Sequence, residues 1–285
     1  MEHRYVFLMA REERYLNRER GKQMAFNYEQ QEMELLMREY RLTLETSQDR
    51  TFSIPSMDLL NRDKCLEYLT KTGEIFEAET LMANASLFGK RYSYLVVASS
   101  LYAMSVFDKG LDYCLENCHI ESERQGHAWL PKARLANMEV TSPQPNARQQ
   151  WRDGVINHIF EHNLSRVWDA ISRFVPMSKA VLWENTAIYV FWLYENKFLE
   201  GLQEEQQARL REDLSYLVQA PAHLFGEKKN PLATFYGPKV ATVGSEKPIR
   251  IRKTCCYYYQ ASDEPEDYCS SCPKIKHELI PESVI

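Results

Sequence analysis

Four cysteines near the C-terminus place the strongest constraint on the fold of this 285-residue chain. Cys255 and Cys256 are adjacent, twelve residues follow, and Cys269 and Cys272 form a C-x-x-C pair. Four thiolates in one short segment suit an iron–sulfur cluster or a tetrahedral zinc site, so the segment has to fold around a shared centre. Structural zinc sites usually have two C-x2-4-C pairs, and adjacent cysteines fit that turn poorly. The spacing favours a cluster and leaves zinc, or a redox-active thiol group, open.

The seven cysteines are not expected to form a disulfide framework. Their number is odd, and the apolar run Tyr5–Ala10 is shorter than the ~7 to 15 residues of a signal-peptide core. We therefore expect a cytoplasmic, reducing location, with peripheral attachment to the inner membrane as an option. Residues 92–107 carry no charge, but they are fewer than the ~20 residues of a membrane span. They predict a buried core helix.

Most of the chain up to residue 217 has apolar residues at helical spacing. Patterns that predict helices run from Met33 to Leu44 and over residues 65–85, 151–174 and 182–194, the last after a candidate cap at Ser178. The segment 142–147 contains two prolines and is predicted to be a loop that divides two helical lobes.

The composition changes after residue 220. Glycine, proline and β-branched residues, with alternation over residues 249–252, predict short strands or a hairpin. We therefore predict a mainly α protein. A helical substrate-binding domain, residues 1–225, forms a cleft, and a C-terminal segment of strands and loop, residues 226–285, carries the four-cysteine site. The net charge of -5 gives no reason to expect a nucleic-acid partner.

Other candidate sites carry less weight. His158, Glu161 and His162 match the H-x-x-E-H pattern of zinc proteases, but the neighbouring apolar stripe faces away from the histidines, so the trio is predicted to face solvent. Residues that could join a second metal site are interpreted as core or idle: Cys65, Cys114, Cys118 and His119. Since the chain has no glycine-rich phosphate loop, an electron has to come from a protein partner.

The segments RKTCC and YCSSCP around the cysteines resemble the [2Fe-2S] motif of the FhuF-like ferric siderophore reductases. The resemblance reaches back through NPLATFYGPKV, LWENTAIYV and FGKRYSYLVVASSLYAMSVF, and covers most of the chain from Met57 on. These upstream segments are also similar to the helical part of aerobactin-type siderophore synthetases. The twelve residues between the cysteine pairs are two more than in the family pattern, which lengthens the acidic tip DEPED.

The resemblance implies an enzyme that passes one electron from a [2Fe-2S] cluster to a ferric siderophore and releases ferrous iron. Hard oxygen donors hold ferric iron more tightly than ferrous iron, so the chemistry is sound. A hydroxamate or citrate-hydroxamate siderophore is expected as substrate, and a ferredoxin or flavodoxin as electron donor. The expected metal ligands are Cys255, Cys256, Cys269 and Cys272. Substrate-binding candidates are Lys90, Arg91, Trp183, Lys239, Arg250 and Arg252.

Two alternatives belong to other classes of protein. One is a zinc-stabilised helical protein that binds or senses the siderophore without redox activity. The other is a degenerate siderophore synthetase half, which would bind citrate-like products and would need no cysteine.

Overall fold

The computed structural model describes residues 29–122, 129–243, 245–261, 264 and 267–280, so the apolar run at residues 5–10 lies outside the described residues. The described chain is mainly helical, as predicted. The α-helices are α2 (Gln30–Glu39), α3 (Arg62–Phe76), α4 (Leu81–Phe107), α5 (Arg148–Ile159), α6 (Arg166–Phe174), α7 (Lys179–Glu195), α8 (Glu204–Gln219) and α9 (Pro231–Phe235). A π-helical turn, Phe160–Ser165, joins α5 to α6.

A small sheet lies within the helical part of the chain, where we had predicted no strands. Its four strands are in the order β1–β5–β4–β2, with β1 parallel to β5 and the other pairs antiparallel. A second sheet pairs β3 with β6. The strands are β1 (Leu42–Thr43), β2 (Ile54–Pro55), β3 (Gly110–Leu111), β4 (Cys118–Glu121), β5 (Lys132–Leu135) and β6 (Val140–Thr141).

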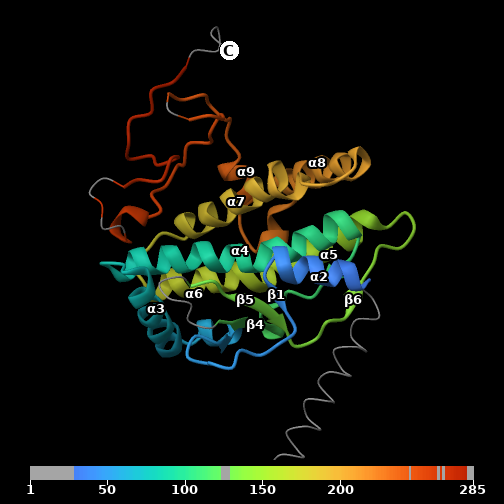
Figure 1. The fold of residues 1–285 in the computed structure, drawn as a ribbon, viewed down its shortest axis with the longest axis horizontal. Coiled ribbons are helices and arrows are strands. Elements are labelled where there is room, and N and C mark those ends of the chain that lie inside the picture. The colour runs from blue at the N-terminus through green and yellow to red at the C-terminus, as the bar shows by residue number, and fades with distance from the viewer. Residues whose placement is uncertain (1–28, 123–128, 244, 262–263, 265–266, 281–285) are drawn as a thin grey trace, which may run out of the picture.

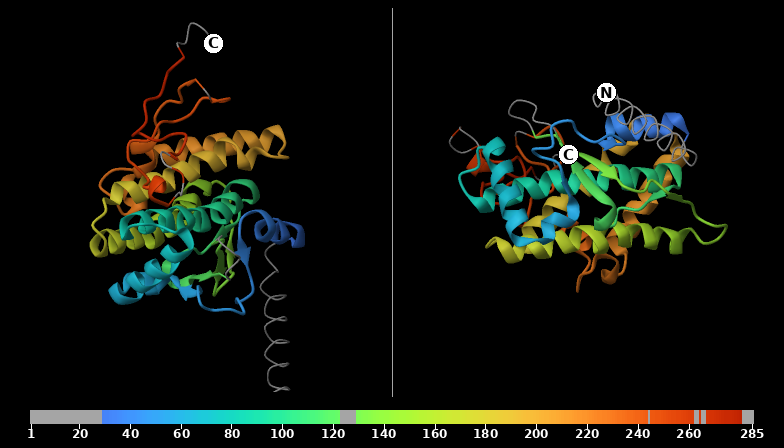
Figure 2. Two further views of the ribbon diagram at one scale, coloured as in Figure 1. Left: turned by 60° about the vertical axis from the view of Figure 1, so that its left-hand side comes forward. Right: turned by 90° about the horizontal axis from the view of Figure 1, so that it is seen from below.

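Helix α4 is the central element of the fold. It begins after Thr80, whose hydroxyl accepts a hydrogen bond from the Ala83 N–H, and ends at Asp108 in the left-handed conformation. Residues 92–107 are almost entirely buried, which confirms the predicted core helix. Figure 1 shows α4 running through the middle of the molecule, with α7 and α8 on one side and the sheet on the other. Figure 2 shows the same layers from two further directions.

Small residues let α4 and α7 approach closely. A Cβ atom on Gly89 would lie 2.6 Å from Cδ2 of Leu182, so only glycine fits at this point. One turn further, the hydroxyls of Ser93 and Thr186 lie 2.9 Å apart. This contact fixes the positions of the residues that precede and follow Gly89 on α4 relative to α7.

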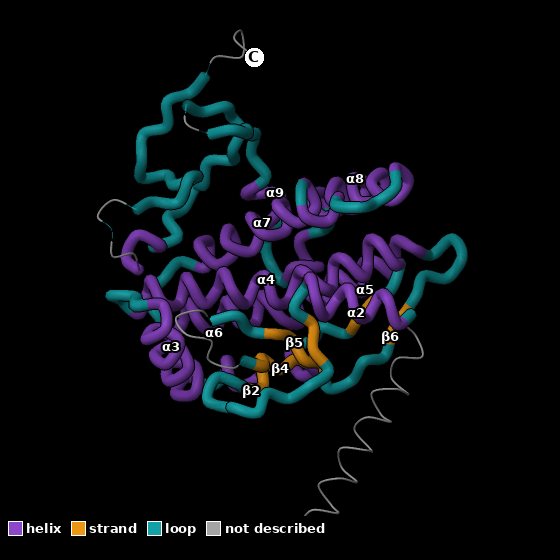
Figure 3. The backbone as a smooth tube through the Cα atoms, viewed as in Figure 1, coloured by secondary structure: helices purple, strands orange, loops and turns teal. Residues whose placement is uncertain are grey.

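Two boundaries differ from the sequence-based expectation. The predicted helix from Met33 to Leu44 ends at Glu39, because Arg41 adopts a φ of 57° and Leu42 enters the sheet. In the described part of the C-terminal segment, the predicted strands are reduced to isolated bridges, Val240 with Ile249 and Thr242 with Leu279. Figure 3 shows this segment mainly as loop that extends from α9, with one short 3-10 helix at Tyr258–Ala261.

The loop at residues 142–147 and the cap at Ser178 are confirmed, since the Ser178 hydroxyl accepts a hydrogen bond from the Ala180 N–H. Residues 65–85 form two helices rather than one, because Glu77 is left-handed and ends α3. Among the described residues, no helix combines the length and the apolar character that a membrane crossing requires.

Candidate metal centre

The four C-terminal cysteines come together at one end of α4 and α7. Cys256 and Cys272 are both 2% exposed, and Cys255 and Cys269 are half-buried. The sulfur atoms of Cys256 and Cys269 are 3.7 Å apart. A backbone hydrogen bond from Arg252 to the carbonyl of Ser271, 3.0 Å long, ties the first cysteine segment to the second.

Each cysteine pair sits in a turn that directs N–H groups at sulfur. In the C-x-x-C turn, the Cys272 N–H donates to the Cys269 carbonyl at 2.9 Å. Tyr257 has a φ of 58°, and its N–H donates to Sγ of Cys255 at 3.4 Å. The Lys274 N–H donates to Sγ of Cys272 at 3.5 Å. Such bonds stabilise thiolates, which are the form of cysteine that binds metal.

The spacing of the sulfur atoms distinguishes between kinds of metal centre. Thiolates on one tetrahedral ion with bonds of about 2.3 Å lie about 3.8 Å from one another. The Cys256–Cys269 pair fits this distance. However, no three of the four sulfur atoms, all of which belong to described residues, lie within 4.8 Å of one another. The four sulfur atoms therefore do not form one compact tetrahedral set, which agrees with a broader centre that holds two metal ions.

Two polar residues of α7, Glu184 and Asn185, anchor the first cysteine pair. The Glu184 carboxylate accepts the N–H groups of Lys253 at 2.6 Å and Thr254 at 2.7 Å, and also the Thr254 hydroxyl. Arg252 Nε lies 3.6 Å from the same carboxylate, with both side chains under 5% exposed. The sequence marked this stretch of α7 only through the resemblance of LWENTAIYV.

Asn185 continues the network to α4. Its Oδ1 accepts from the Arg252 guanidinium at 2.7 Å, and its Nδ2 donates to the carbonyl and the hydroxyl of Ser86. The Ser86 hydroxyl in turn donates to the Cys256 carbonyl at 2.8 Å. Because every group in this buried chain is paired, the backbone of Cys256 is held rigidly against the two helices.

The charges around Cys256 favour its thiolate form. A hydrogen bond from the Cys269 thiol, together with the cations of Lys90 and Arg252, holds the pKa of Cys256 well below its usual range, while burial opposes them. The pKa of Cys269 is raised, because its thiol gives that hydrogen bond and is itself buried. Burial also raises the pKa of Cys255.

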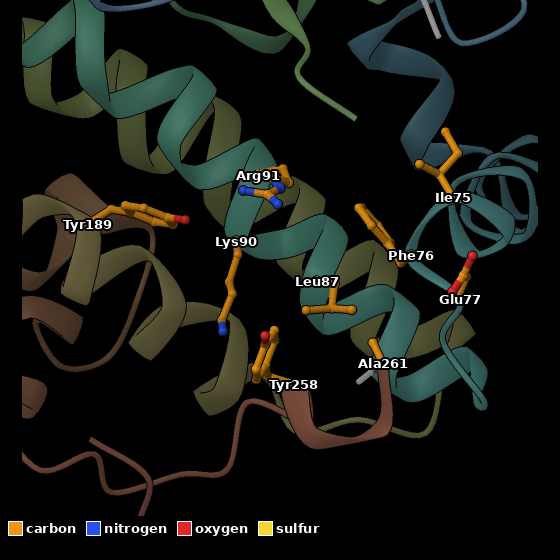
Figure 4. A pocket seen from close by; sticks show the side chains of 9 residues that line it. All are labelled: Ile75, Phe76, Glu77, Leu87, Lys90, Arg91, Tyr189, Tyr258 and Ala261. Carbon is orange, nitrogen blue, oxygen red and sulfur yellow. The ribbon is translucent and has the colours of Figure 1, made fainter. Parts of the chain in front are cut away.

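Lys90 connects the cysteines to a cleft. Its ammonium nitrogen lies 3.2 Å from Sγ of Cys256 and 5.5 Å from the ring centre of Tyr258. The cleft has a volume of about 640 Å³. Figure 4 shows Lys90 extending from α4 toward Tyr258. The lining residues are Ile75, Phe76, Glu77, Leu87, Lys90, Arg91, Tyr189, Tyr258 and Ala261.

The six predicted substrate-binding residues are not brought together. Lys90 and Arg91 line the cleft, whereas Trp183 is 4% exposed and its indole N–H donates to Glu227. The other three pair with carboxylates of α7: Lys239 and Arg250 with Glu195, and Arg252 with Glu184. The substrate roles of all six stay predictions.

Sequence reasoning missed several residues at the cleft. Tyr189 lines it beside Tyr258, one of three consecutive tyrosines that the sequence offered for a siderophore pocket. A second cleft of about 390 Å³ adjoins it, lined by Arg41, Arg91, Tyr94, Ile188, Tyr189 and Trp192. The sequence contained only a weak indication that these residues line a cleft. Tyr94 lies one turn after Lys90 and Arg91 on α4, and Trp192 lies one turn after Ile188 and Tyr189 on α7, but aromatic residues at helical spacing usually belong to the core.

The H-x-x-E-H motif contributes to a different polar cluster. The rings of His158 and His162 are in contact, with centres 5.8 Å apart. His158 Nδ1 lies 3.1 Å from the Asp112 carboxylate, which also accepts the Cys114 N–H at 2.9 Å. The ligand atoms of Asp112, Cys114 and His158 lie within 4.8 Å of one another. Because Asp112 already accepts hydrogen bonds from both partners, the cluster is satisfied without a metal ion.

Comparisons with known proteins agree with this geometry. A family model described as ferric iron reductase FhuF-like transporter matches residues 86–241, which is more than half of the chain. A second model, described as the FhuF 2Fe-2S C-terminal domain, matches residues 252–274 and thus all four C-terminal cysteines. No curated protein matches the chain. The chain belongs to the FhuF-like ferric iron reductase family and carries that family's 2Fe-2S C-terminal domain.

Proposed function

We propose that the protein reduces ferric siderophores by one electron, with a [2Fe-2S] cluster held by Cys255, Cys256, Cys269 and Cys272. Membership of a ferric iron reductase family supports the activity, and the 2Fe-2S domain supports the cofactor. One contact carries the proposal: Lys90 donates to Sγ of Cys256 and also lines the cleft. A chelate in the cleft therefore lies beside a cysteine ligand of the cluster.

The sulfur positions support a two-iron centre. Cys256 and Cys269, whose sulfur atoms are 3.7 Å apart, would hold the cluster together with Cys255 and Cys272. When bound, the cluster supplies electrons one at a time. Since oxygen donors hold ferric iron far more tightly than ferrous iron, one electron is enough to release it.

The protein's own residues bind and position the chelate. Leu87, Phe76 and Ile75 give the cleft an apolar wall next to the cations Lys90 and Arg91. The apolar wall excludes water and so strengthens the attraction of these cations for an anionic chelate. Release of the metal follows reduction and needs no acid or base at a fixed position; of the described lining residues, Glu77 alone carries a carboxylate.

We place the reaction in the cytoplasm, with a ferredoxin or flavodoxin as electron donor. Residues 1–225 are assigned to substrate binding, and residues 226–285 to the cluster. The two family matches also divide the chain into a longer first part and a cysteine-containing second part, but at a later point, between residues 241 and 252.

Chemical analysis of anaerobically purified protein tests the cofactor and the activity together. The proposal predicts two irons and two acid-labile sulfides per chain, and one-electron reduction of a ferric siderophore by the dithionite-treated protein. The variant Cys272→Ser is expected to lose both. The matched control is Cys114→Ser, which changes a half-buried cysteine outside the site and is expected to keep both. One zinc per chain without sulfide would contradict the proposal.

A further inference from the structure

The cleft beside the cysteines adjoins the second cleft. Arg91 and Tyr189 line both, so the two share a wall. Phe76 and Tyr258 are among the residues that line the first cleft, and Trp192 is among those that line the second. We call the two adjoining clefts, both lined in part by α4 and α7, the α4–α7 groove; Lys90 of the first cleft contacts Sγ of Cys256. The groove offers a subsite at a distance from the cluster.

The α4–α7 groove holds three cations that lack carboxylate partners. Within the described ranges, Lys90, Arg91 and Arg41 form no ion pair with any aspartate or glutamate. In contrast, Lys239 and Arg250 pair with Glu195, and Arg252 pairs with Glu184. Among the described residues that line the two clefts, only Glu77 carries a carboxylate. Such an excess of positive charge in a concave site attracts anions.

Aromatic rings form the remaining wall of the second cleft. The ring centres of Tyr94 and Tyr189 are 5.4 Å apart, and those of Tyr94 and Trp192 are 6.5 Å apart. Trp192 is 43% exposed although it lies on a largely buried helix. Exposed rings of this kind offer flat faces on which a planar ligand arm can stack.

The position of Arg41 has a cost in backbone energy. Its φ of 57° lies in the left-handed region, which is unfavourable for a residue with a side chain. The surrounding structure holds it there: the Arg41 carbonyl accepts from the Ala133 N–H at 2.8 Å, and its guanidinium lies 5.1 Å from the centre of the Tyr94 ring. The burial of this guanidinium lowers the pKa of Arg41. The fold thus keeps a half-buried cation, without a carboxylate partner, aimed at the groove.

We propose that the second cleft is a specificity subsite that binds the negatively charged arms of the ferric chelate. On this reading the protein selects chelates of net negative charge over neutral ones, and aromatic arms add stacking. The net charge of the metal complex differs between the classes of siderophore. Three dianionic catecholates leave three negative charges on a trivalent metal complex, a citrate-based ligand leaves free carboxylate charge, and three monoanionic hydroxamates leave none. The inference rests on the proposed function, because it concerns the same substrate.

Gallium complexes test the subsite without electron transfer, because Ga³⁺ resembles Fe³⁺ in charge and ligand preference but is not reduced under these conditions. The probes are the Ga³⁺ complexes of a tris-catecholate, of a citrate-hydroxamate and of a linear trihydroxamate. Their binding to the intact protein is measured by calorimetry and by quenching of tryptophan fluorescence. Both anionic complexes are expected to bind at least roughly tenfold more tightly than the trihydroxamate, and more weakly as ionic strength rises.

Two variants assign the effect to the groove. Arg91→Gln is expected to weaken both anionic complexes by roughly ten- to hundredfold, the loss typical of one hydrogen bond to a charged group, and to leave the trihydroxamate unchanged. Trp192→Ala is expected to weaken the tris-catecholate most, which separates stacking from charge. The control is Arg211→Gln, which removes an exposed arginine of α8 that pairs with Glu204.

The outcomes separate the inference from the proposed function. Equal or tighter binding of the trihydroxamate, or no effect of Arg91→Gln, would overturn the subsite. If the ferric trihydroxamate is still reduced in that case, the reductase activity stands. If the anionic gallium complexes bind as expected but their ferric counterparts are not reduced, the subsite stands and the proposed function fails.

Discussion

The ammonium nitrogen of Lys90 lies 3.2 Å from Sγ of Cys256, and the same side chain lines the cleft in which we place the substrate. A single residue of α4 thus contacts both the cysteine site and the cleft. In the described part of the chain this ammonium has no carboxylate partner. Its charge therefore acts mainly on the sulfur and on whatever occupies the cleft.

Removing this charge is predicted to make the cluster a stronger reductant. In Lys90→Met the thiolate of Cys256 loses a charge-assisted hydrogen bond, so the more negative reduced cluster is destabilised and the reduction potential falls. Such a bond contributes about 1.5–3 kcal/mol, and 59 mV corresponds to about 1.4 kcal/mol for one electron. The reduction potential depends only on how much the strength of this hydrogen bond differs between the oxidised and the reduced cluster. We therefore expect the potential to decrease by tens of millivolts in a redox titration followed by electron paramagnetic resonance. Lys90→Arg keeps the charge and is expected to shift the potential less. Equal potentials for the Met variant and the natural protein would refute the role of Lys90.

The carboxylate of Glu184 is predicted to hold the C-terminal segment on the helices. Glu184→Ala removes the acceptor of the Lys253 and Thr254 N–H groups and leaves the buried guanidinium of Arg252 without its carboxylate. Breaking a buried pair in this way costs about 3–5 kcal/mol. Amide hydrogen exchange at residues 250–274 should become faster, while Glu205→Ala, on the exposed first turn of α8, should leave it unchanged. Unchanged protection in the Glu184 variant would show that other contacts hold the segment.

The close approach of α4 and α7 is predicted to depend on Gly89. Its added methyl group would lie 2.6 Å from Cδ2 of the buried Leu182, so Gly89→Ala displaces this side chain within the packed core and destabilises the fold by about 1–3 kcal/mol. The matched control is Gly154→Ala on α5, where a Cβ meets nothing within 4 Å. Alanine there favours the helix by about 0.5–1 kcal/mol. Denaturant unfolding measures both, and a neutral Gly89→Ala would contradict the packing described.

The Asp112–His158 pair is predicted to make stability depend on pH. The hydrogen bond to Asp112 raises the pKa of His158, so the pair stabilises the fold fully below the ordinary histidine pKa of about 6.5. This contribution is lost as pH rises through the raised folded value. The same bond lowers the pKa of Asp112, so acid removes the contribution as well. In Asp112→Asn, an NMR titration of the His158 ring should show a lower pKa than in the natural protein. No decrease would mean that the pair is open in solution.

The sequence was most informative where one local pattern decides the outcome. Cysteine spacing predicted which residues the fold brings together at the candidate metal centre, because all four thiols lie within one short segment. The uncharged run of residues 92–107 predicted the central helix, because such a run is stable only when it is buried. In contrast, the strands of the small sheet are two to four residues long, too short for alternation to be visible.

The partners of the basic residues could not be predicted from the sequence. Positive charge around residues 239–252 suggested substrate binding, but Arg250 and Arg252 reach carboxylates of α7, which is distant in the chain. Arg41 continued an apparent helix in the apolar pattern, and only its left-handed backbone turns it toward the groove. Ion pairs and strained backbone both depend on tertiary structure, so neither leaves a local signal.

A single-turnover experiment measures electron transfer from the reduced protein to a ferric siderophore. Protein reduced with dithionite, and freed of excess reductant, is mixed anaerobically with a ferric siderophore while the visible absorption of the cluster and the formation of ferrous iron are followed together. We expect the absorption spectrum of the oxidised cluster to return while one ferrous ion forms per cluster. The rate of this reoxidation should increase with siderophore concentration and then saturate. Reduced protein that stays reduced in the presence of every class of ferric siderophore would contradict the proposed electron transfer.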